Sequence, residues 1–352
     1  MFRQHIRRHF QLSTGRPPVK SMRDIFSRDE VGGSGGLELF TKCRIVIWTT
    51  SQKDAMSTAT FTHAAHSVEH GALCDSELHR GLDAHLYHSS VDLPSCSLLK
   101  AMLISPAHYQ AQLLARHTKS AARDFGTLVH ALVLEPGTFS REFAVFPGKR
   151  DGRDSDFKAF LLANAGRSVI DELELDAGRR LAEKILHRQV MGRPFGDLVS
   201  EGTPEASIYY TDPATGIRCR VRIDLLHPEG VFDLKTTMHP TASAWLRQAL
   251  SLHYDMQSYM YVLAVSLLRG ATTPPPFVFV AAENEMPHSV SVYPAGSTFI
   301  ENGGKKYQTA LGGYAACSKV GYWPDASSDA VLEINHWQAM GDKPSWAQET
   351  AP

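Results

Sequence analysis

Two aspartates and a lysine stand on short, mostly apolar segments on either side of a tight turn. CRVRIDLL carries Asp224, HPEG makes the turn, and VFDLKTT carries Asp233 and Lys235. Charged groups on apolar strands are unfavourable unless they pair or bind an ion. Side chains alternate faces along a strand, so both carboxylates and the lysine can meet on one side of such a hairpin. The spacing therefore predicts a site for a metal, a partner or a substrate.

Metal-assisted phosphodiester cleavage is the chemistry that would use this set of side chains. Mg²⁺ takes oxygen ligands from one or two carboxylates, keeps waters and binds substrate phosphate. It polarises the phosphoryl group and lowers the pKa of a bound water. Lys235 would orient the nucleophile and offset developing negative charge. The same alternation puts a row of arginines on the face of Asp224, either as phosphate contacts or as a solvated sheet face: Arg218, Arg220 and Arg222.

The surrounding pattern predicts how these residues are positioned. Residues 206–211, 217–226 and 231–237 read as a meander of three antiparallel strands, with Cys219, Val221, Ile223 and Leu225 facing the core. An almost wholly apolar helix over 121–135 carries His130, and such a helix is buried. We expect a long amphipathic helix over 241–269, a strand over 274–284, a helix near 298–318, and helical periodicity over 94–114, interrupted at Pro106.

D-x8-D-x-K on adjacent strands resembles the PD-(D/E)XK nuclease motif. GTLVHALVLE (126–135) is similar to the helix that opens the RecB-like branch of that superfamily, and QSYMY (257–261) fits its Q-x3-Y motif. PEASIYYTDPATGIRCRVRID and VFDLKTT together look like the nuclease domain of the exodeoxyribonuclease VIII (RecE) family. SLLKAMLISPAHYQ (97–110) fits the segment that begins that domain. The resemblance spans roughly residues 81–320.

This resemblance implies an α/β fold with a PD-(D/E)XK, restriction-endonuclease-like core, in which a central mixed β-sheet is flanked by α-helices. It implies that Lys235 is the catalytic lysine and that Gln257 and Tyr261 position DNA or the attacking water. Asp233 stands where many relatives have Glu, as expected within the RecE-like group. Glu205 resembles an acid that recurs at the head of the first strand. The implied metal ligands are His130, Asp224, Asp233 and the main-chain carbonyl of Leu234.

The implied activity is a Mg²⁺-dependent exonuclease, with Mn²⁺ as a substitute, that digests linear double-stranded DNA from the 5′ end. It would leave 3′ single-stranded overhangs for recombination, as in phage systems. The resemblance also implies a homo-oligomeric ring threaded by DNA and a RecT-like single-strand annealing protein as partner.

Composition sets broad limits on this interpretation. The chain has 352 residues and a net charge of −1, so a DNA-binding surface would have to be local. The five cysteines form no CxxC pair, which favours a reducing cytoplasm over disulfides or a zinc site. No apolar run approaches the roughly 18 residues of a membrane span. We expect a basic, flexible region over residues 1–80, with a transit peptide as the alternative, then an exonuclease domain over 81–325 and a tail over 326–352.

Each residue also has a structural interpretation. His130 can be a core histidine, Asp224 and Asp233 can pair with Arg222 and Lys235, and Gln257 and Tyr261 can simply pack a helix. Among functions, the alternatives are a catalytically inactive DNA-binding protein with the same fold and a RecB-like nuclease with a different substrate. A Cas4- or AddB-like iron–sulfur nuclease needs several cysteines beyond the core, where only Cys317 lies. A site-specific restriction endonuclease would lack the Q-x3-Y helix.

Overall fold

The computed structural model describes residues 46–48, 61–63, 75–90, 92–115, 125–238 and 241–326, together with residues 331 and 333. Contacts divide the chain into residues 1–41 and residues 42–352, and the first unit lies outside the described residues. Most of the predicted basic region and of the predicted tail also lies outside them. The short strands β1 (Val46–Trp48) and β2 (Phe61–His63) pair antiparallel.

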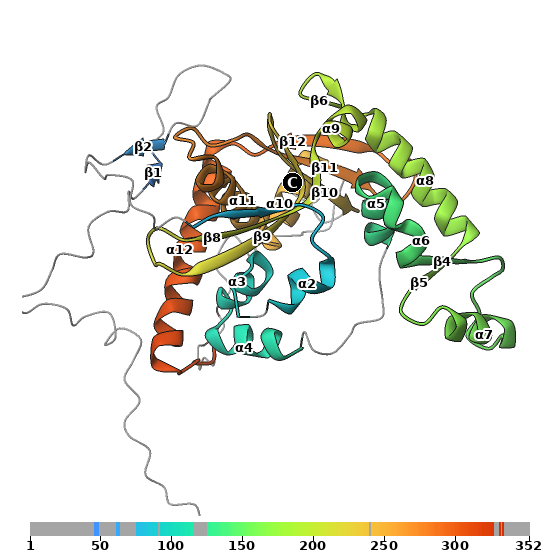
Figure 1. Ribbon diagram of the computed structural model, residues 1–352, viewed down its shortest axis with the longest axis horizontal. Helices are drawn as coiled ribbons and strands as arrows, with labels where there is room; N and C mark the ends of the chain where they lie inside the picture. The colour runs from blue at the N-terminus through green and yellow to red at the C-terminus, as the bar shows by residue number, and fades with distance from the viewer. Residues whose placement is uncertain are drawn as a thin grey trace, which may run out of the picture. The chain divides into compact units, whose positions relative to one another are not determined.

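A six-stranded mixed sheet forms the centre of the described structure (Figure 1). Only β10 and β11 run parallel, and every other neighbouring pair is antiparallel. This arrangement confirms the predicted α/β fold with a central mixed sheet. In spatial order the strands are β12 (Val290–Pro294), β11 (Phe277–Glu283), β10 (Gly230–Thr237), β9 (Arg218–His227), β8 (Thr203–Thr211) and β3 (Glu77–His79).

The meander of β8, β9 and β10 owes its register to its turns. Between β8 and β9, the Asp212 carboxylate accepts from the backbone N–H groups of Ala214 and Thr215, and Gly216 takes a φ of 70° that favours glycine. Thr211 then lies opposite Arg218, and the pairing continues to Thr203 opposite Leu226. The edge strand β3 shows that the sheet begins upstream of residue 81.

Helices cover both faces of the sheet (Figure 1). One cluster of buried side chains joins the sheet to the α3, α4, α10, α11 and α12 helices, and a second cluster joins it to α5, α8 and α9. The first group is α3 (Cys96–Met102), α4 (Pro106–Ala115), α10 (Ala242–Ser251), α11 (Tyr254–Arg269) and α12 (Ser297–Val320). The second group is α5 (Phe125–Leu134), α8 (Glu172–His187) and α9 (Phe195–Glu201).

Helix α5, which carries His130, is held against both the sheet and α8. Its buried side chains include Val129 and Val133, in the same cluster as Phe232 and Leu234 of β10. Gly178 of α8 lies so close to Leu128 that a Cβ there would be 2.9 Å from a leucine methyl group. The small residue lets the two helices approach, which fixes the backbone around His130.

The remaining elements extend the chain around this core. The two-stranded sheets are parallel for β4 with β5 and antiparallel for β6 with β7. Helix α2 follows β3 and begins at Asp83, whose carboxylate accepts from the N–H of His85. The elements are α2 (Ala84–Ser89), η1 (Pro136–Thr138), α6 (Phe139–Glu142), β4 (Phe143–Phe146), α7 (Ser155–Ala163), β5 (Ser168–Asp171), β6 (Gln189–Val190) and β7 (Arg193–Pro194).

Two local predictions are wrong. The predicted helix over 241–269 is two helices, α10 and α11, because His253 adopts a left-handed φ of 54° that a right-handed helix cannot continue through. The predicted alternation along β9 also fails at Leu225. Ile223 packs in the cluster beneath α11, whereas Leu225 packs with Phe232 in the cluster beneath α5. The strand changes face at Asp224, where the β8 backbone opposite also departs from a regular pleat.

Among the described residues, no helix combines the length and apolar character needed to cross a lipid bilayer.

Candidate active site

The candidate site lies where β9 and β10 separate. Their backbone pairing runs from Gly230 opposite His227 to Phe232 opposite Leu225 and stops there. At the next position, the Asp224 carboxylate accepts a hydrogen bond from the backbone N–H of Leu234 at 2.9 Å. A side chain thus takes the place of a strand carbonyl. The exchange orients Asp224 and opens the hairpin at the position of both predicted acids.

Three side chains from different elements converge on this opening. Ligand atoms of His130 on α5, Glu205 on β8 and Asp224 on β9 all lie within 4.8 Å of one another. His130 Nε2 lies 2.7 Å from the carbonyl oxygen of Leu234, and its Nδ1 lies 3.9 Å from the Asp224 carboxylate. The carbonyl can only accept, so in a neutral imidazole Nδ1 is unprotonated and presents a lone pair on the side of Asp224.

This donor set fits a divalent cation. It comprises two carboxylates, an imidazole nitrogen and a nearby main-chain carbonyl, which suit hard cations such as Mg²⁺ and Mn²⁺. Burial, reinforced by the negative charge of Asp224, raises the pKa of Glu205 to about 7. A cation between the carboxylates would remove that repulsion. When bound there, it would polarise a phosphate and make a coordinated water more acidic.

Lys235 stands beside the cluster and is paired with Asp233. Its Nζ lies 2.5 Å from an Asp233 oxygen and 3.9 Å from Asp224. Burial alone would lower the pKa of Lys235, but the two carboxylates raise it above its ordinary value. The ammonium group therefore stays charged at neutral pH. It can attract a phosphate and stabilise negative charge that develops on it.

Asp233 has no exposed surface, and both of its oxygens have protein neighbours. One lies against Lys235, and the other accepts from Gln257 Nε2 at 2.7 Å. Burial raises the pKa of Asp233 to about 6, although Lys235 acts in the opposite direction. The residue is next to the His130–Glu205–Asp224 cluster rather than part of it, so its role as a third metal ligand remains a prediction.

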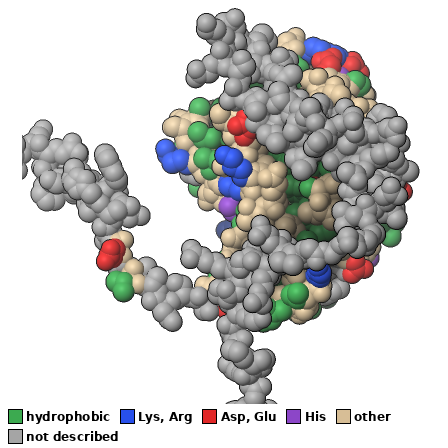
Figure 2. All heavy atoms as spheres, turned by 90° about the vertical axis from the view of Figure 1, so that its left-hand side faces the viewer, with side chains coloured by type: hydrophobic (Ala, Val, Ile, Leu, Met, Phe, Trp, Pro, Cys, Tyr) green, Lys and Arg blue, Asp and Glu red, His purple; other side chains and the backbone are tan. Residues whose placement is uncertain are grey.

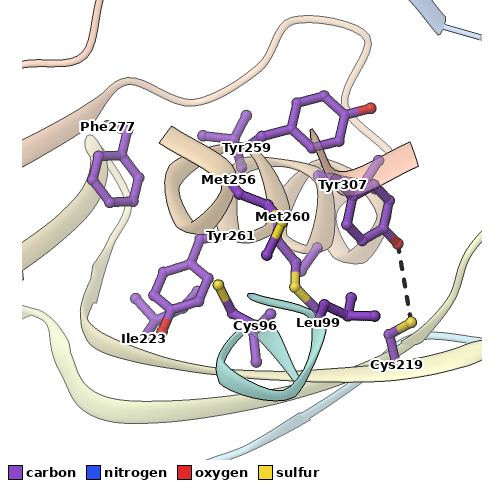
Figure 3. Close-up of a cluster of buried hydrophobic side chains, with 14 of the residues drawn as sticks. Cys96, Leu99, Cys219, Ile223, Met256, Tyr259, Met260, Tyr261, Phe277 and Tyr307 are labelled. Atoms are coloured by element: carbon purple, nitrogen blue, oxygen red, sulfur yellow. Dashed lines mark hydrogen bonds between the residues drawn. The ribbon is translucent and has the colours of Figure 1, made fainter. Parts of the chain in front are cut away.

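Gln257 and Tyr261 lie one turn apart on α11, and both are buried. Figure 3 shows Tyr261 on the side of α11 that points toward α3 and the sheet, near Cys96 and Ile223. Burial raises the pKa of Tyr261 well above its ordinary value, so its hydroxyl remains protonated. The structure thus brings Gln257 to Asp233 and brings Tyr261 to the cavity next to the acids.

A cavity of about 230 Å³ opens beside the cluster. It contains polar side chains of α3 and α11 as well as an aromatic wall from α2. Lys100 of α3 reaches toward Gln257, with 3.5 Å between Nζ and Oε1. The residues that line the cavity are Tyr87, His88, Ser95, Cys96, Ser97, Lys100, Glu205, Val221, Arg222, Asp224, Gln257 and Tyr261.

Each of the three arginines in the predicted row contacts other groups of the protein. Arg218 forms ion pairs with Asp75 and Glu77. Arg220 is fully buried, donates from Nε to the carbonyl of Leu93 and stacks on the ring of Tyr87 at 4.6 Å. Arg222 donates to the Glu205 carboxylate at 2.6 Å. Phosphate binding by this row remains a prediction.

Comparison with known proteins agrees with this fold. Residues 95–334 match the model of a family described as a PDDEXK-like domain of unknown function (DUF3799). The chain belongs to this family. The PDDEXK-like domain also resembles the crystal structure of a "putative exonuclease" from Eubacterium rectale, with a TM-score of 0.50 at 13% sequence identity. That match covers 72% of this chain and 96% of the other. Among curated proteins, none matches this sequence.

Membership confirms the predicted PD-(D/E)XK superfamily and its nuclease fold. In the structure, Asp224, Asp233 and Lys235 lie together at the point where the two strands separate. Glu205 is the member of the His130–Glu205–Asp224 cluster to which the sequence assigned no role. The length of the turn between β8 and β9 carried a usable signal, since pairing Ala206 with Ile223 and Pro204 with Leu225 leaves Glu205 opposite Asp224. Nothing in the sequence distinguishes Lys100 from other helical lysines.

Proposed function

We propose that this PDDEXK-like domain is a divalent-metal-dependent exodeoxyribonuclease acting on linear double-stranded DNA. The observation that carries the proposal is the cluster of His130, Glu205 and Asp224 next to the Lys235–Asp233 pair. An imidazole and two acids that face one another can together bind a divalent cation. The charged lysine beside them can bind a phosphate and stabilise its negative charge.

In this proposal His130, Glu205 and Asp224 hold Mg²⁺, for which Mn²⁺ substitutes, and the Leu234 carbonyl contributes a further oxygen. Lys235 orients the attacking water and offsets charge on the phosphate. Gln257 holds Asp233 through its hydrogen bond, which keeps the lysine in place. Tyr261 positions DNA or water from the cavity wall.

The exonuclease assignment and its RecE-type details are supported by resemblance. The motifs of residues 97–110, 126–135 and 257–261 occur in the order of that family, and the structural neighbour is described as an exonuclease. We therefore propose digestion in the 5′→3′ direction, 3′ overhangs for recombination, a homo-oligomeric ring and a RecT-like annealing partner. Cys96, Cys219 and Cys317 are unpaired and buried, in keeping with a cytoplasmic setting.

The charge distribution favours local contacts with DNA over a broad basic surface. On the face shown in Figure 2, Lys and Arg side chains of the described residues form small, separate groups among hydrophobic and uncharged ones. The net charge of −1 agrees with this. Cationic groups at the site itself, such as Lys235 and Lys100, would then bind the phosphates at a duplex end.

The test compares linear and covalently closed circular duplex DNA, each incubated with Mg²⁺ or with EDTA. We expect loss of the linear form alone, and only with metal. Asp233→Ala should abolish the activity, whereas Asp176→Ala, an exposed aspartate on α8, should not. DNA binding without hydrolysis in either Mg²⁺ or Mn²⁺ would instead identify a catalytically inactive DNA-binding protein.

End-labelled duplex DNA tests the direction of digestion. A 5′ label should appear first in short products, and the 3′-labelled strand should remain long. The reverse order would contradict the RecE-type assignment while leaving the metal-dependent nuclease intact.

A further inference from the structure

Arg222 is held by three neighbouring groups of the protein. Its Nε donates to Glu205 Oε2 at 2.6 Å, and its Nη1 donates to the carbonyl oxygen of Leu82 at 2.9 Å and lies 3.4 Å from Ser207 Oγ. Only 13% of the Arg222 side chain is exposed. The guanidinium group is therefore engaged on the protein side. An arginine that binds an incoming phosphate would instead keep its guanidinium N–H groups available to that phosphate.

The Glu205 carboxylate stays in the His130–Glu205–Asp224 cluster only if a neighbouring group holds it there. It adopts a φ of 49°, a region that non-glycine residues enter only when surrounding contacts hold them there. It also lies opposite Asp224 between two paired positions of the ladder, so the two carboxylates repel each other. The contact from Arg222 is a charge-assisted hydrogen bond that opposes both tendencies.

The segment that follows β3 and begins α2 determines the position of Arg222. Leu82 immediately precedes Asp83, the residue that caps α2, so the start of the helix sets the direction of the Leu82 carbonyl. Tyr87 of α2 is buried, and its ring centre lies 5.6 Å from the Arg222 guanidinium carbon. The neighbouring Arg220 stacks more closely on the same ring. Residues 82–87 thus form a seat for the guanidinium group.

We propose that Arg222 is a positioning residue that holds the Glu205 carboxylate at the metal-binding face, and that the seat formed by residues 82–87 holds Arg222. The proposal rests on the metal site of the proposed function. It replaces a direct phosphate contact by Arg222 with an indirect role in metal binding.

The planar fork of arginine is essential to this role. Arg222 donates from two different nitrogens in two directions, to Glu205 and to Leu82. Lysine has one ammonium group on a flexible stem and cannot reproduce that geometry, although it keeps the charge. A phosphate contact tolerates this exchange far better than a positioning contact does. Arg222→Lys therefore separates the two roles.

The experiment measures Mn²⁺ binding by calorimetry without DNA, on the full chain and on folded variants verified by circular dichroism. Arg222→Lys should weaken binding by about tenfold or more, as for other groups that orient metal ligands. The matched control is Arg193→Lys, because Arg193 pairs with Glu201 and Glu229 away from the cluster. Its Mn²⁺ affinity should equal that of the wild type.

Two further variants extend the test, and the first, Tyr87→Leu, keeps the proposal testable if Arg222→Lys folds poorly. Tyr87→Leu removes the aromatic seat but leaves both charges, and it should also weaken Mn²⁺ binding. Adding Arg222→Lys to Glu205→Gln should cause little further loss, since the first residue acts through the second.

Unchanged Mn²⁺ affinity in Arg222→Lys and Tyr87→Leu would overturn the positioning role. So would a salt dependence of DNA binding in EDTA whose slope falls by about one unit in Arg222→Gln, which removes the positive charge, because that change is the sign of a lost phosphate contact. Failure of the wild-type chain to bind Mn²⁺ would instead contradict the proposed metal site itself.

Discussion

His130 Nε2 and the main-chain carbonyl oxygen of Leu234 lie 2.7 Å apart, and they join the buried helix α5 to the strand that carries Asp233 and Lys235. This contact sets the orientation of the imidazole. It leaves Nδ1 on the side of Asp224. The helix therefore contributes more than packing, because it presents an imidazole nitrogen at the point where β9 and β10 separate.

His130→Ala should lower Mn²⁺ affinity by about tenfold or more, because it removes the only nitrogen ligand of the His130–Glu205–Asp224 cluster. Calorimetry without DNA measures this. His187→Ala is the matched control, since His187 also contacts a main-chain carbonyl, that of Glu183, but is exposed on α8. Equal affinities for the two variants would argue that His130 is a core histidine only.

Asp233→Asn should destabilise the protein by about 3 kcal/mol, because it leaves the half-buried charge of Lys235 without its main partner. The value lies at the low end for such pairs since Asp224 is also 3.9 Å from Lys235. Adding Lys235→Met should restore much of the lost stability but no nuclease activity. Urea denaturation and digestion of linear duplex DNA provide the two measurements. A double variant no more stable than Asp233→Asn alone would contradict this account of the pair.

Without metal, stability should fall as pH rises toward neutrality. The folded-state pKa values of Glu205 and Asp233 are raised to about 7 and about 6 from ordinary values of 4.5 and 3.8. The folded protein therefore binds more protons than the unfolded chain between those values. This contribution is complete below about pH 4 and is lost as pH passes through 6 and 7. Thermal denaturation in EDTA across this range measures the loss.

Mn²⁺ affinity should change in the opposite direction and increase from pH 6 to pH 8, because metal and protons compete for the same carboxylates. Glu205→Gln should remove the part of this increase near pH 7 and should lower the affinity at pH 8. Calorimetry at several pH values measures both effects. An affinity independent of pH in the wild-type chain would exclude Glu205 as a ligand.

Gly303→Ala should destabilise the protein by about 3 kcal/mol or more, as overpacking in a rigid contact does. An added Cβ would lie 1.9 Å from the backbone oxygen of Asp255, at the start of the helix that carries Gln257. Gly312→Ala is the control. Gly312 lies on α12, as Gly303 does, but nothing lies within 4 Å of its added Cβ. That change should stabilise the helix by about 0.5–1 kcal/mol. Thermal denaturation of both variants is the measurement, and equal effects would contradict the close α11–α12 contact.

Local pattern was enough to predict the meander, the buried helix α5 and the proximity of Asp224 to Asp233. Each depends on residues close in sequence. Turn length sets the pairing of neighbouring strands, and an apolar periodicity marks a buried helix. The break between α10 and α11 was not predictable in this way. His253 has no special backbone preference of the kind glycine has, and Asp255 just after it is bound by Lys306 and Asn302 of α12.

The sequence by itself determined the PD-(D/E)XK superfamily, the mixed α/β sheet and the order of the acids and the lysine on the two strands. Only the tertiary structure decided that Glu205 joins His130 and Asp224, and that Arg222 faces Leu82 and Glu205. The physical reason is distance along the chain. His130 meets Leu234 across 104 positions and Arg222 meets Leu82 across 140, so packing rather than local preference selects these partners.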